Sequence, residues 1–260
     1  MERATVGKLI GGIVGCMNGG EKIEKCTNSG KVTAANQQAG GIAGRQNSGT
    51  IRECSNCGEI STLESNVAGG IVGYMDTGSE KIENCTNSGK VTAATQKAGG
   101  IAGQQNSGII RECSNSGEIY SATGTSTAIG GGIVGMVDGT STEVTKVYNQ
   151  GTVKCEDNAK DGDRIGGIIG FIKSAKASAI TKAYNKGSLI GGDSNCVGAI
   201  VGRNNASNAV SNCYYYFATE SSIPGIGGTT ATAEGNYLTG TTRSYTNYAT
   251  RNDFLNGEGK

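Results

Sequence analysis

Residues 11–32 read GGIVGCMNGGEKIEKCTNSGKV and contain the two motifs that decide the fold. The first motif is Gly-Gly-Ile-Val-Gly, and the second is Ile-x-x-Cys-x-Asn-x-Gly-x-Val, which begins at Ile23. The central isoleucine of the first motif recurs as Ile13, Ile42, Ile71, Ile101, Ile133, Ile168 and Ile200, at spacings of 29, 29, 30, 32, 35 and 32 residues. A regular period of this length is the sequence signature of a repeat architecture.

The second motif alternates as a β-strand does. Small or apolar residues lie at every second position from Cys26 to Val32, and polar residues lie between them. This period of two is typical of a strand with one buried face. The 45 glycines of the 260-residue chain disfavour helix. The pattern predicts an all-β fold, a parallel β-helix (β-solenoid) with one repeat per coil and about three short strands in each coil.

Two polar positions of the repeat indicate how the coils stack. The residue after the glycine of the second motif reads Lys31, Glu59, Lys90 and Glu118 in successive repeats, and the residue after its isoleucine reads Glu24, Arg52, Glu83 and Arg111. Both series alternate in sign. Opposite charges directly across a pair of strands stabilise a sheet by roughly 0.2–1 kcal/mol, whereas like charges destabilise it. The alternation therefore predicts that equivalent residues of successive coils are neighbours.

The cysteines and asparagines of the second motif are predicted to face inward. Five of the nine cysteines share one position, where other repeats have Val147 and Ala183, so this position requires a small apolar residue and predicts a column of buried thiols. Disulfides between neighbouring coils remain an alternative. Cys57 replaces a serine and should face solvent. The inward asparagines predict a hydrogen-bonded ladder, with a ligand-binding polar row as the alternative, and the glycines two residues later are expected to have positive φ.

Composition excludes several functions. The chain has no histidine, which excludes a Ser-His-Asp triad, a Cys-His dyad and a His-based zinc motif. The formal net charge is +1, so no overall field attracts nucleic acid, and no apolar run approaches the length that spans a membrane. We therefore expect no catalytic residues, no cofactor, no nucleic-acid partner and no membrane-spanning segment.

The repeated motifs, from about residue 6 to residue 216, resemble the GLUG-motif repeat family. This family occurs in secreted and surface proteins of bacteria, including adhesin-like proteins and immunoglobulin A-specific peptidases. The resemblance implies a right-handed parallel β-solenoid of about seven coils at a bacterial surface, without implying peptidase activity. It also implies a solenoid domain at 1–216 and an aromatic capping segment at 217–260. No signal peptide precedes the first coil, so the chain is interpreted as a fragment of a longer secreted protein, monomeric as isolated.

Two segments interrupt the repeat and are the candidate sites. Residues 155–164 contain Asp157, Asp161 and Asp163, which are weak calcium candidates in what is otherwise a solvated loop. Tyr214, Tyr215 and Tyr216 close the last repeat, where they can cap the open coil or form an aromatic platform for sugars.

The sequence thus predicts a non-catalytic module, a rigid spacer or adhesive display surface whose partner is a protein or glycan on a host or neighbouring cell. The alternative is a carbohydrate-active parallel β-helix enzyme, which would need clustered carboxylates on one wall. An ice-binding threonine array is disfavoured, because Thr33, Thr92, Thr145 and Thr181 form no continuous column.

Overall fold

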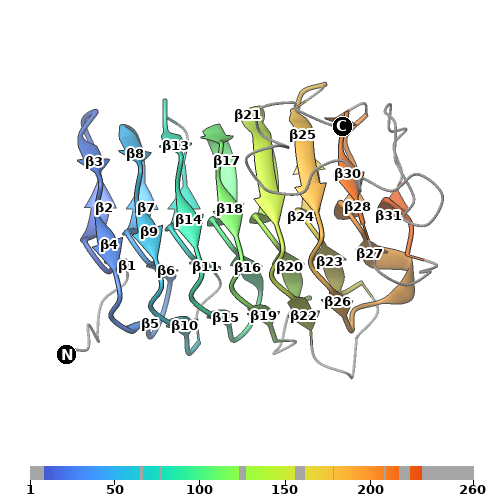
Figure 1. Ribbon diagram of the computed structural model, residues 1–260, viewed down its shortest axis with the longest axis horizontal. Helices are drawn as coiled ribbons and strands as arrows, with labels where there is room; N and C mark the ends of the chain where they lie inside the picture. Colours follow the sequence, from blue (N-terminus) through green and yellow to red (C-terminus); the bar gives the residue numbers. More distant parts are fainter. Residues whose placement is uncertain are drawn as a thin grey trace.

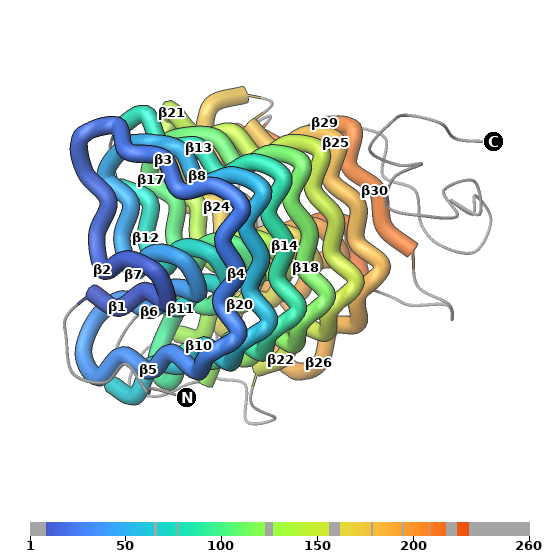
Figure 2. Tube along the Cα trace, turned by 60° about the vertical axis from the view of Figure 1, so that its left-hand side comes forward, coloured from blue at the N-terminus to red at the C-terminus, as the bar shows by residue number. Residues whose placement is uncertain are grey.

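The fold is a parallel β-solenoid, with successive coils stacked along one axis (Figures 1 and 2). The computed structural model describes residues 9–64, 67–76, 78–122, 127–155, 162–177, 179–207, 209–216 and 223–229. Among these residues the structure has strands and one short 3₁₀ helix, η1 (Ser194–Cys196), and no α-helix. The expected all-β solenoid is therefore confirmed. No helix in the described ranges is long and apolar enough to cross a membrane.

The strands form three sheets that run the length of the solenoid. The seven-stranded sheet contains β1 (Leu9–Gly11), β6 (Gln38–Gly40), β11 (Val67–Gly69), β16 (Lys97–Gly99), β20 (Ile129–Gly131), β23 (Arg164–Gly166) and β27 (Val197–Gly198). The six-stranded sheet contains β5 (Val32–Ala34), β10 (Ile60–Thr62), β15 (Val91–Ala93), β19 (Ile119–Ser121), β22 (Val153–Cys155) and β26 (Leu189–Ile190). Each coil begins with a strand of the seven-stranded sheet.

The third sheet is the largest and covers the rest of each coil. It contains β2 (Val14–Met17), β3 (Lys22–Glu24), β4 (Thr27–Asn28), β7 (Ala43–Gln46), β8 (Thr50–Arg52), β9 (Ser55–Asn56), β12 (Val72–Met75), β13 (Lys81–Glu83), β14 (Thr86–Asn87), β17 (Ala102–Arg111), β18 (Ser114–Asn115), β21 (Val134–Asn149), β24 (Ile169–Ser174), β25 (Ile180–Asn185), β28 (Val201–Asn204), β29 (Val210–Ser211), β30 (Tyr214–Tyr215) and β31 (Ile226–Thr229). We call it the long sheet.

Two details differ from the expectation. The first three coils each hold five short strands rather than three, because bends divide the long sheet within a coil, whereas β21 runs unbroken through 16 residues of coil five. Six coils are closed by a strand of the six-stranded sheet, and the seventh, from β27 to β30, has no such strand among the described residues. β31 pairs with β28, so stacked strands continue beyond the boundary expected at residue 216.

Equivalent residues pair in register along most of the stack, with shifts in the long sheet between Gln105 and Ser107 and between Val137 and Asp138. The isoleucine that begins the second motif pairs with its equivalent, Ile23 with Ile51 and Ile51 with Ile82, and all three pack in the same core. Complete burial of an isoleucine side chain stabilises a fold by roughly 1.5–3 kcal/mol. Ile13 of the first described coil is 47% exposed, whereas Ile42, Ile71 and Ile101, which have a described coil on either side, are fully buried.

The cysteine column is buried, as expected. Cys54, Cys85, Cys113 and Cys213 are at most 1% exposed, as are Val147 and Ala183 at the same position, and Cys26 of the open first coil is partly exposed. All nine cysteines are free thiols, and Cys57 is exposed. The side-chain hydrogen bond with Cys113 and burial raise the pKa of the Cys85 thiol, and burial raises the pKa of Cys213 to about 12.

The asparagine ladder is also present. Each amide Nδ2 donates to the Oδ1 of the asparagine in the next coil, from Asn28 to Asn56, Asn87, Asn115, Asn149 and Asn185, at 2.7–2.9 Å. The second hydrogen of each Nδ2 goes to the carbonyl of the glycine two residues later, for example from Asn87 to Gly89 at 2.9 Å. The buried donors are thereby satisfied, as burial requires.

The prediction of positive φ at these glycines is wrong. The left-handed conformation occurs instead at the residue before the cysteine column, with φ of 50–56° at Lys25, Glu53, Asn84, Glu112, Lys146, Lys182 and Asn212. The glycines serve a different purpose: a Cβ on Gly58 would lie 2.0 Å from the carbonyl oxygen of Gly30 in the preceding coil. Close stacking, rather than a special φ, therefore excludes a side chain at this position.

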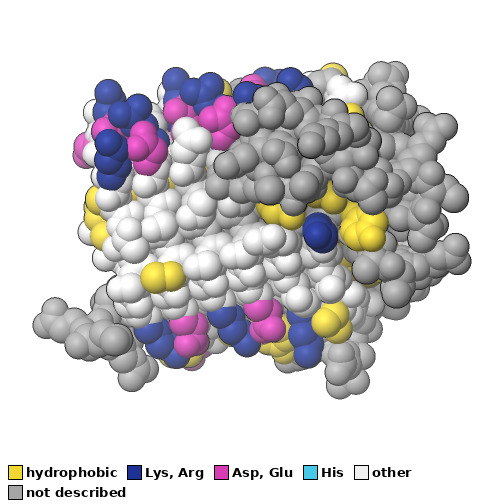
Figure 3. Space-filling view, in the orientation of Figure 1, with side chains coloured by type: hydrophobic (Ala, Val, Ile, Leu, Met, Phe, Trp, Pro, Cys, Tyr) yellow, Lys and Arg dark blue, Asp and Glu magenta, His cyan; other side chains and the backbone are white. Residues whose placement is uncertain are grey.

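The charged columns pair across coils. Nζ of Lys31 is 3.0 Å from Oε1 of Glu59, and Nζ of Lys90 is 2.7 Å from Oε1 of Glu118. In the second column Arg52 pairs with Glu24 at 2.8 Å and Arg111 with Glu83 at 3.0 Å. Figure 3 displays these charges as two rows, over β3, β8 and β13 and beside β5, β10 and β15, with mostly uncharged surface between them.

Thiol reactivity tests the cysteine arrangement. Incubation of the native protein with iodoacetamide near pH 8 should modify Cys57 first and leave Cys54, Cys85, Cys113 and Cys213 intact, because burial both blocks access and, at Cys213, raises the thiol pKa. Peptide mass spectrometry locates the modified residues. In urea without reductant all nine thiols should react, and fewer would reveal disulfides.

Substitution of one ladder residue tests the stacking of amides. We expect Asn87→Ala to lower the free energy of unfolding by about 1–3 kcal/mol, because Asn56 Nδ2 loses its acceptor and Asn115 Oδ1 loses its donor. Urea denaturation measures this loss. Ser29→Ala, at an exposed position beside Asn28, serves as the control. Equal stability of the two variants would mean that the ladder contributes nothing.

Reversal of one charge tests the columns. Glu59→Lys places three lysines in adjacent coils and should destabilise the protein by about 0.2–1 kcal/mol, more than Glu59→Gln does. Urea denaturation at low and high salt measures the effect, and salt should diminish it because these side chains are half exposed. An effect of the lysine that is independent of salt would contradict electrostatic repulsion between coils.

Candidate functional site

The calcium candidates do not come together as a site in the described residues. Asp157 and Asp161 lie outside those residues. Asp163 is fully buried, and its Oδ1 accepts a hydrogen bond of 2.8 Å from the backbone N of Ala128, so this carboxylate stabilises the chain at the start of coil five. Across the described ranges no three His, Cys, Asp or Glu residues are grouped as metal ligands would be.

The three tyrosines face in different directions. Tyr215 pairs with Asn185, so it lies at the ladder position, and it is only 3% exposed. Tyr214 and Tyr216 are half-buried and pack on the outer stack of Tyr148 and Tyr184, whose ring centroids are 5.3 Å apart. Tyr215 therefore belongs to the core, and the three rings do not form one platform for a sugar.

The candidate site is instead a groove along the outer surface where the seven-stranded sheet meets the long sheet. Two rows of side chains line it, and they come from the position two residues before each Gly-Gly-Ile motif and the position three residues after its isoleucine. The row on the seven-stranded sheet reads Leu9, Gln38, Val67, Lys97, Ile129 and Arg164, and the row on the long sheet reads Cys16, Arg45, Tyr74, Gln104, Met136, Phe171 and Arg203.

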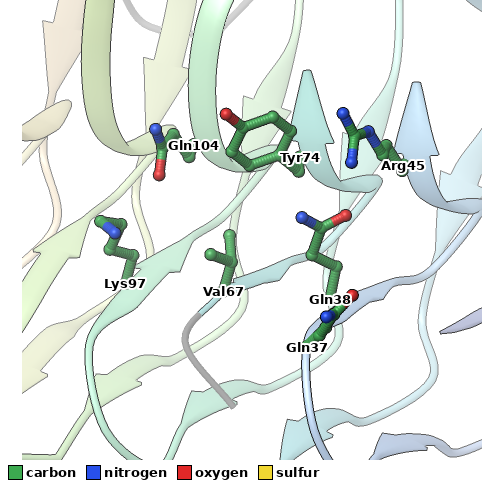
Figure 4. Close-up of a pocket in the computed structure, with 7 residues that line it drawn as sticks. All are labelled: Gln37, Gln38, Arg45, Val67, Tyr74, Lys97 and Gln104. Carbon is green, nitrogen blue, oxygen red and sulfur yellow. The ribbon is translucent and has the colours of Figure 1, made fainter. Parts of the chain in front are cut away.

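Coils two to four hollow this groove into a cavity of about 330 Å³. Its lining residues are Gln37, Gln38, Arg45, Val67, Tyr74, Lys97 and Gln104. Figure 4 shows the two rows facing each other, with Arg45, Tyr74 and Gln104 on one side and Gln38, Val67 and Lys97 on the other. The cavity therefore combines two cations, amide groups and one aromatic ring.

Hydrogen bonds hold the long-sheet wall of the cavity in place. The Arg45 guanidinium forms an ion pair with Asp76 of the next coil, which raises the pKa of Arg45, and its Nε donates to Oδ1 of Asn47 at 2.7 Å. The guanidinium carbon lies 5.4 Å from the centre of the Tyr74 ring, a cation–π contact. The Tyr74 hydroxyl accepts a hydrogen bond from Asn106, and burial raises the pKa of Tyr74.

The opposite wall contains two polar groups that can form further hydrogen bonds, the ammonium of Lys97 and the side-chain carbonyl oxygen of Gln38. Lys97 is half-buried, and its burial lowers the pKa of the ammonium group. Its Nζ donates to Oε1 of Gln96 at 3.1 Å, and none of the ion pairs among the described residues includes it. The Oε1 of Gln38 is buried without a hydrogen-bond donor. A buried acceptor without a partner is costly, so it marks a position where a ligand donor can bind.

The two rows of positions continue past the cavity with more apolar side chains. Ile129, Met136 and Phe171 form a small cluster of buried side chains. The Arg164 guanidinium lies 4.0 Å from the centre of the Phe171 ring, and its buried Nε has no hydrogen-bond acceptor. Burial lowers the pKa of Arg164, and the proximity of Arg203 lowers it further.

Sequence analysis did not identify any of the cavity residues. A search for recurring residues finds the framework, because framework residues recur from coil to coil. The groove is lined by two positions whose residue changes from one repeat to the next. The useful signal was the contrast between a nearly invariant Gly-Gly-Ile core and its near neighbours, which read Gln38 and Arg45 in one repeat and Lys97 and Gln104 in another.

Comparisons with known proteins agree with this architecture. Residues 64–92 match the sequence model of the GLUG motif. A crystal structure of a "putative immunoglobulin A1 protease" from Bacteroides ovatus superimposes with a TM-score of 0.60, covering 88% of this chain and 79% of that chain at 20% sequence identity. At this identity the similarity concerns the fold alone. A search of curated proteins finds no match. Residues 64–92 therefore carry a GLUG motif, and the described chain that contains them folds as a parallel β-solenoid.

Proposed function

We propose that this chain is a non-catalytic repeat module of a bacterial surface protein, which holds a display surface for a glycan or protein partner on a rigid spacer. The observation that carries the proposal is the contrast between the framework and the groove. The ladder asparagines, buried isoleucines and paired charges recur from coil to coil, whereas the two groove positions change in every coil. Solenoids with constant frames and variable surface positions suit partner binding.

The arrangement of carboxylates supports binding rather than catalysis. A glycosidase-like mechanism needs a pair of carboxyl groups that face the substrate. In this chain Glu24, Glu59, Glu83 and Glu118 form ion pairs on the walls, and Asp76 is paired with Arg45 beside the cavity. The GLUG motif supports a location outside the cell, where its repeats are found in secreted and surface proteins.

Turnover assays test the proposal. The purified chain should release no reducing ends from neutral or acidic polysaccharides and should leave immunoglobulin A1 intact on a denaturing gel. Binding in a screen of glycans and host proteins should survive Glu83→Gln, which alters only a wall ion pair. Turnover of any polysaccharide that a single carboxylate substitution abolishes would support a carbohydrate-active enzyme and overturn the proposal.

A further inference from the structure

We propose that the groove binds an acidic polysaccharide, with the cavity of coils two to four receiving a sugar whose anionic group meets the Lys97 ammonium. This inference rests on the proposed function and names the ligand class of its display surface. The cavity combines two cations, amide groups and an aromatic ring.

An anionic ligand follows from the charges around Lys97. The acidic group that acts on it electrostatically is Asp138, but both oxygens of that carboxylate are already engaged. Oδ2 of Asp138 accepts from Nζ of Lys173 at 2.9 Å, and Oδ1 accepts from Oγ of Ser174 at 3.0 Å. The half-buried Lys97 therefore carries a charge that the protein does not neutralise through an ion pair. A carboxylate or sulfate in the cavity would supply a charge-assisted hydrogen bond.

A sugar fits the remaining groups better than a peptide. Gln38 and Gln104 present amides, which donate and accept hydrogen bonds as hydroxyl groups do, and the buried Gln38 Oε1 lacks a donor that a sugar hydroxyl can supply. Val67 and Tyr74 offer apolar surface between them for the face of a pyranose ring. An extended peptide would need a free sheet edge, whereas the groove runs over sheet faces whose strands are already paired with the coils on either side.

The spacing of the cations indicates a polymer rather than a single sugar. Arg45, Lys97 and Arg164 lie in coils two, four and six, and the groove positions of coils three and five contain only uncharged residues. Arg203 in coil seven ends this alternation. Coils stack at about 4.8 Å, so these cations recur about every 10 Å along the groove. One pyranose unit is close to one coil in length. A polysaccharide with an anionic group on every second sugar therefore matches the alternation of charged and uncharged coils.

The experiment measures binding of the whole chain to four probes by isothermal titration calorimetry at low salt. The probes are hyaluronan, with a carboxylate on every second sugar, polygalacturonate, with one on every sugar, neutral dextran and poly-glutamate. We expect hyaluronan to bind most tightly. Lys97→Gln should weaken that binding about tenfold or more, because a charge-assisted hydrogen bond is lost, while Lys97→Arg should retain most of it. Added salt should weaken it as well.

Lys90→Gln is the matched control, because Lys90 pairs with Glu118 on the six-stranded sheet and lies outside the groove. It should bind hyaluronan as the unaltered chain does, and urea denaturation should show both glutamine variants folded. Equal losses in the two variants, or no loss in Lys97→Gln, would overturn the groove assignment. Preferred binding of dextran or poly-glutamate, or no binding to either acidic polysaccharide, would overturn the ligand class. None of these results measures turnover. The turnover assays therefore test the non-catalytic proposal independently of the ligand class.

Discussion

Each residue of a coil lies directly against its own equivalent in the next coil, about 4.8 Å away, and this one constraint governs the structure. A residue type can occupy a repeat position only if it is compatible with a copy of itself or if its neighbour changes to suit it. Asparagine meets the first condition because its amide both donates and accepts, as between Asn56 and Asn87. Isoleucine meets it by packing. A charged residue does not meet this condition, because it would repel a copy of itself, so Lys31 faces Glu59 rather than another lysine.

The same constraint explains why the framework could be predicted from sequence. Period, register, ladder and charge pairs all concern residues that interact with their equivalents, and a repeat displays those equivalents directly. The left-handed corner escaped prediction because its residues, such as Lys25, Glu53 and Asn84, are not glycine. A side chain at this corner can form an ion pair with the next coil, since Nζ of Lys25 lies 3.8 Å from Oε2 of Glu53. Glycine appears instead where the preceding backbone comes too close for a Cβ, as at Gly58.

The groove escaped prediction for the opposite reason. Its two positions lie outside the two large hydrophobic clusters of the core, where a side chain need not match its equivalent, and so Val67 can be followed by Lys97 and then by Ile129. No period links these residues, and the chemistry of the cavity depends on contacts between rows, such as that of Arg45 with Tyr74. Such contacts join positions that no motif connects. The framework can therefore be predicted from one sequence, whereas the side chains that meet on its surface are identified only once the fold is known.

The ladder also gives the solenoid a direction. Each ladder asparagine from Asn28 to Asn149 donates toward the higher-numbered coil, so the amide dipoles align head to tail and reinforce one another. A new coil can join the array only in the same orientation, as a monomer joins a polar filament. Gene duplication satisfies this requirement automatically, because each copied unit carries its own donor and acceptor. Tyr215 occupies the ladder position after Asn185 and has no side-chain amide to continue the row of hydrogen bonds, so the ladder ends at this position.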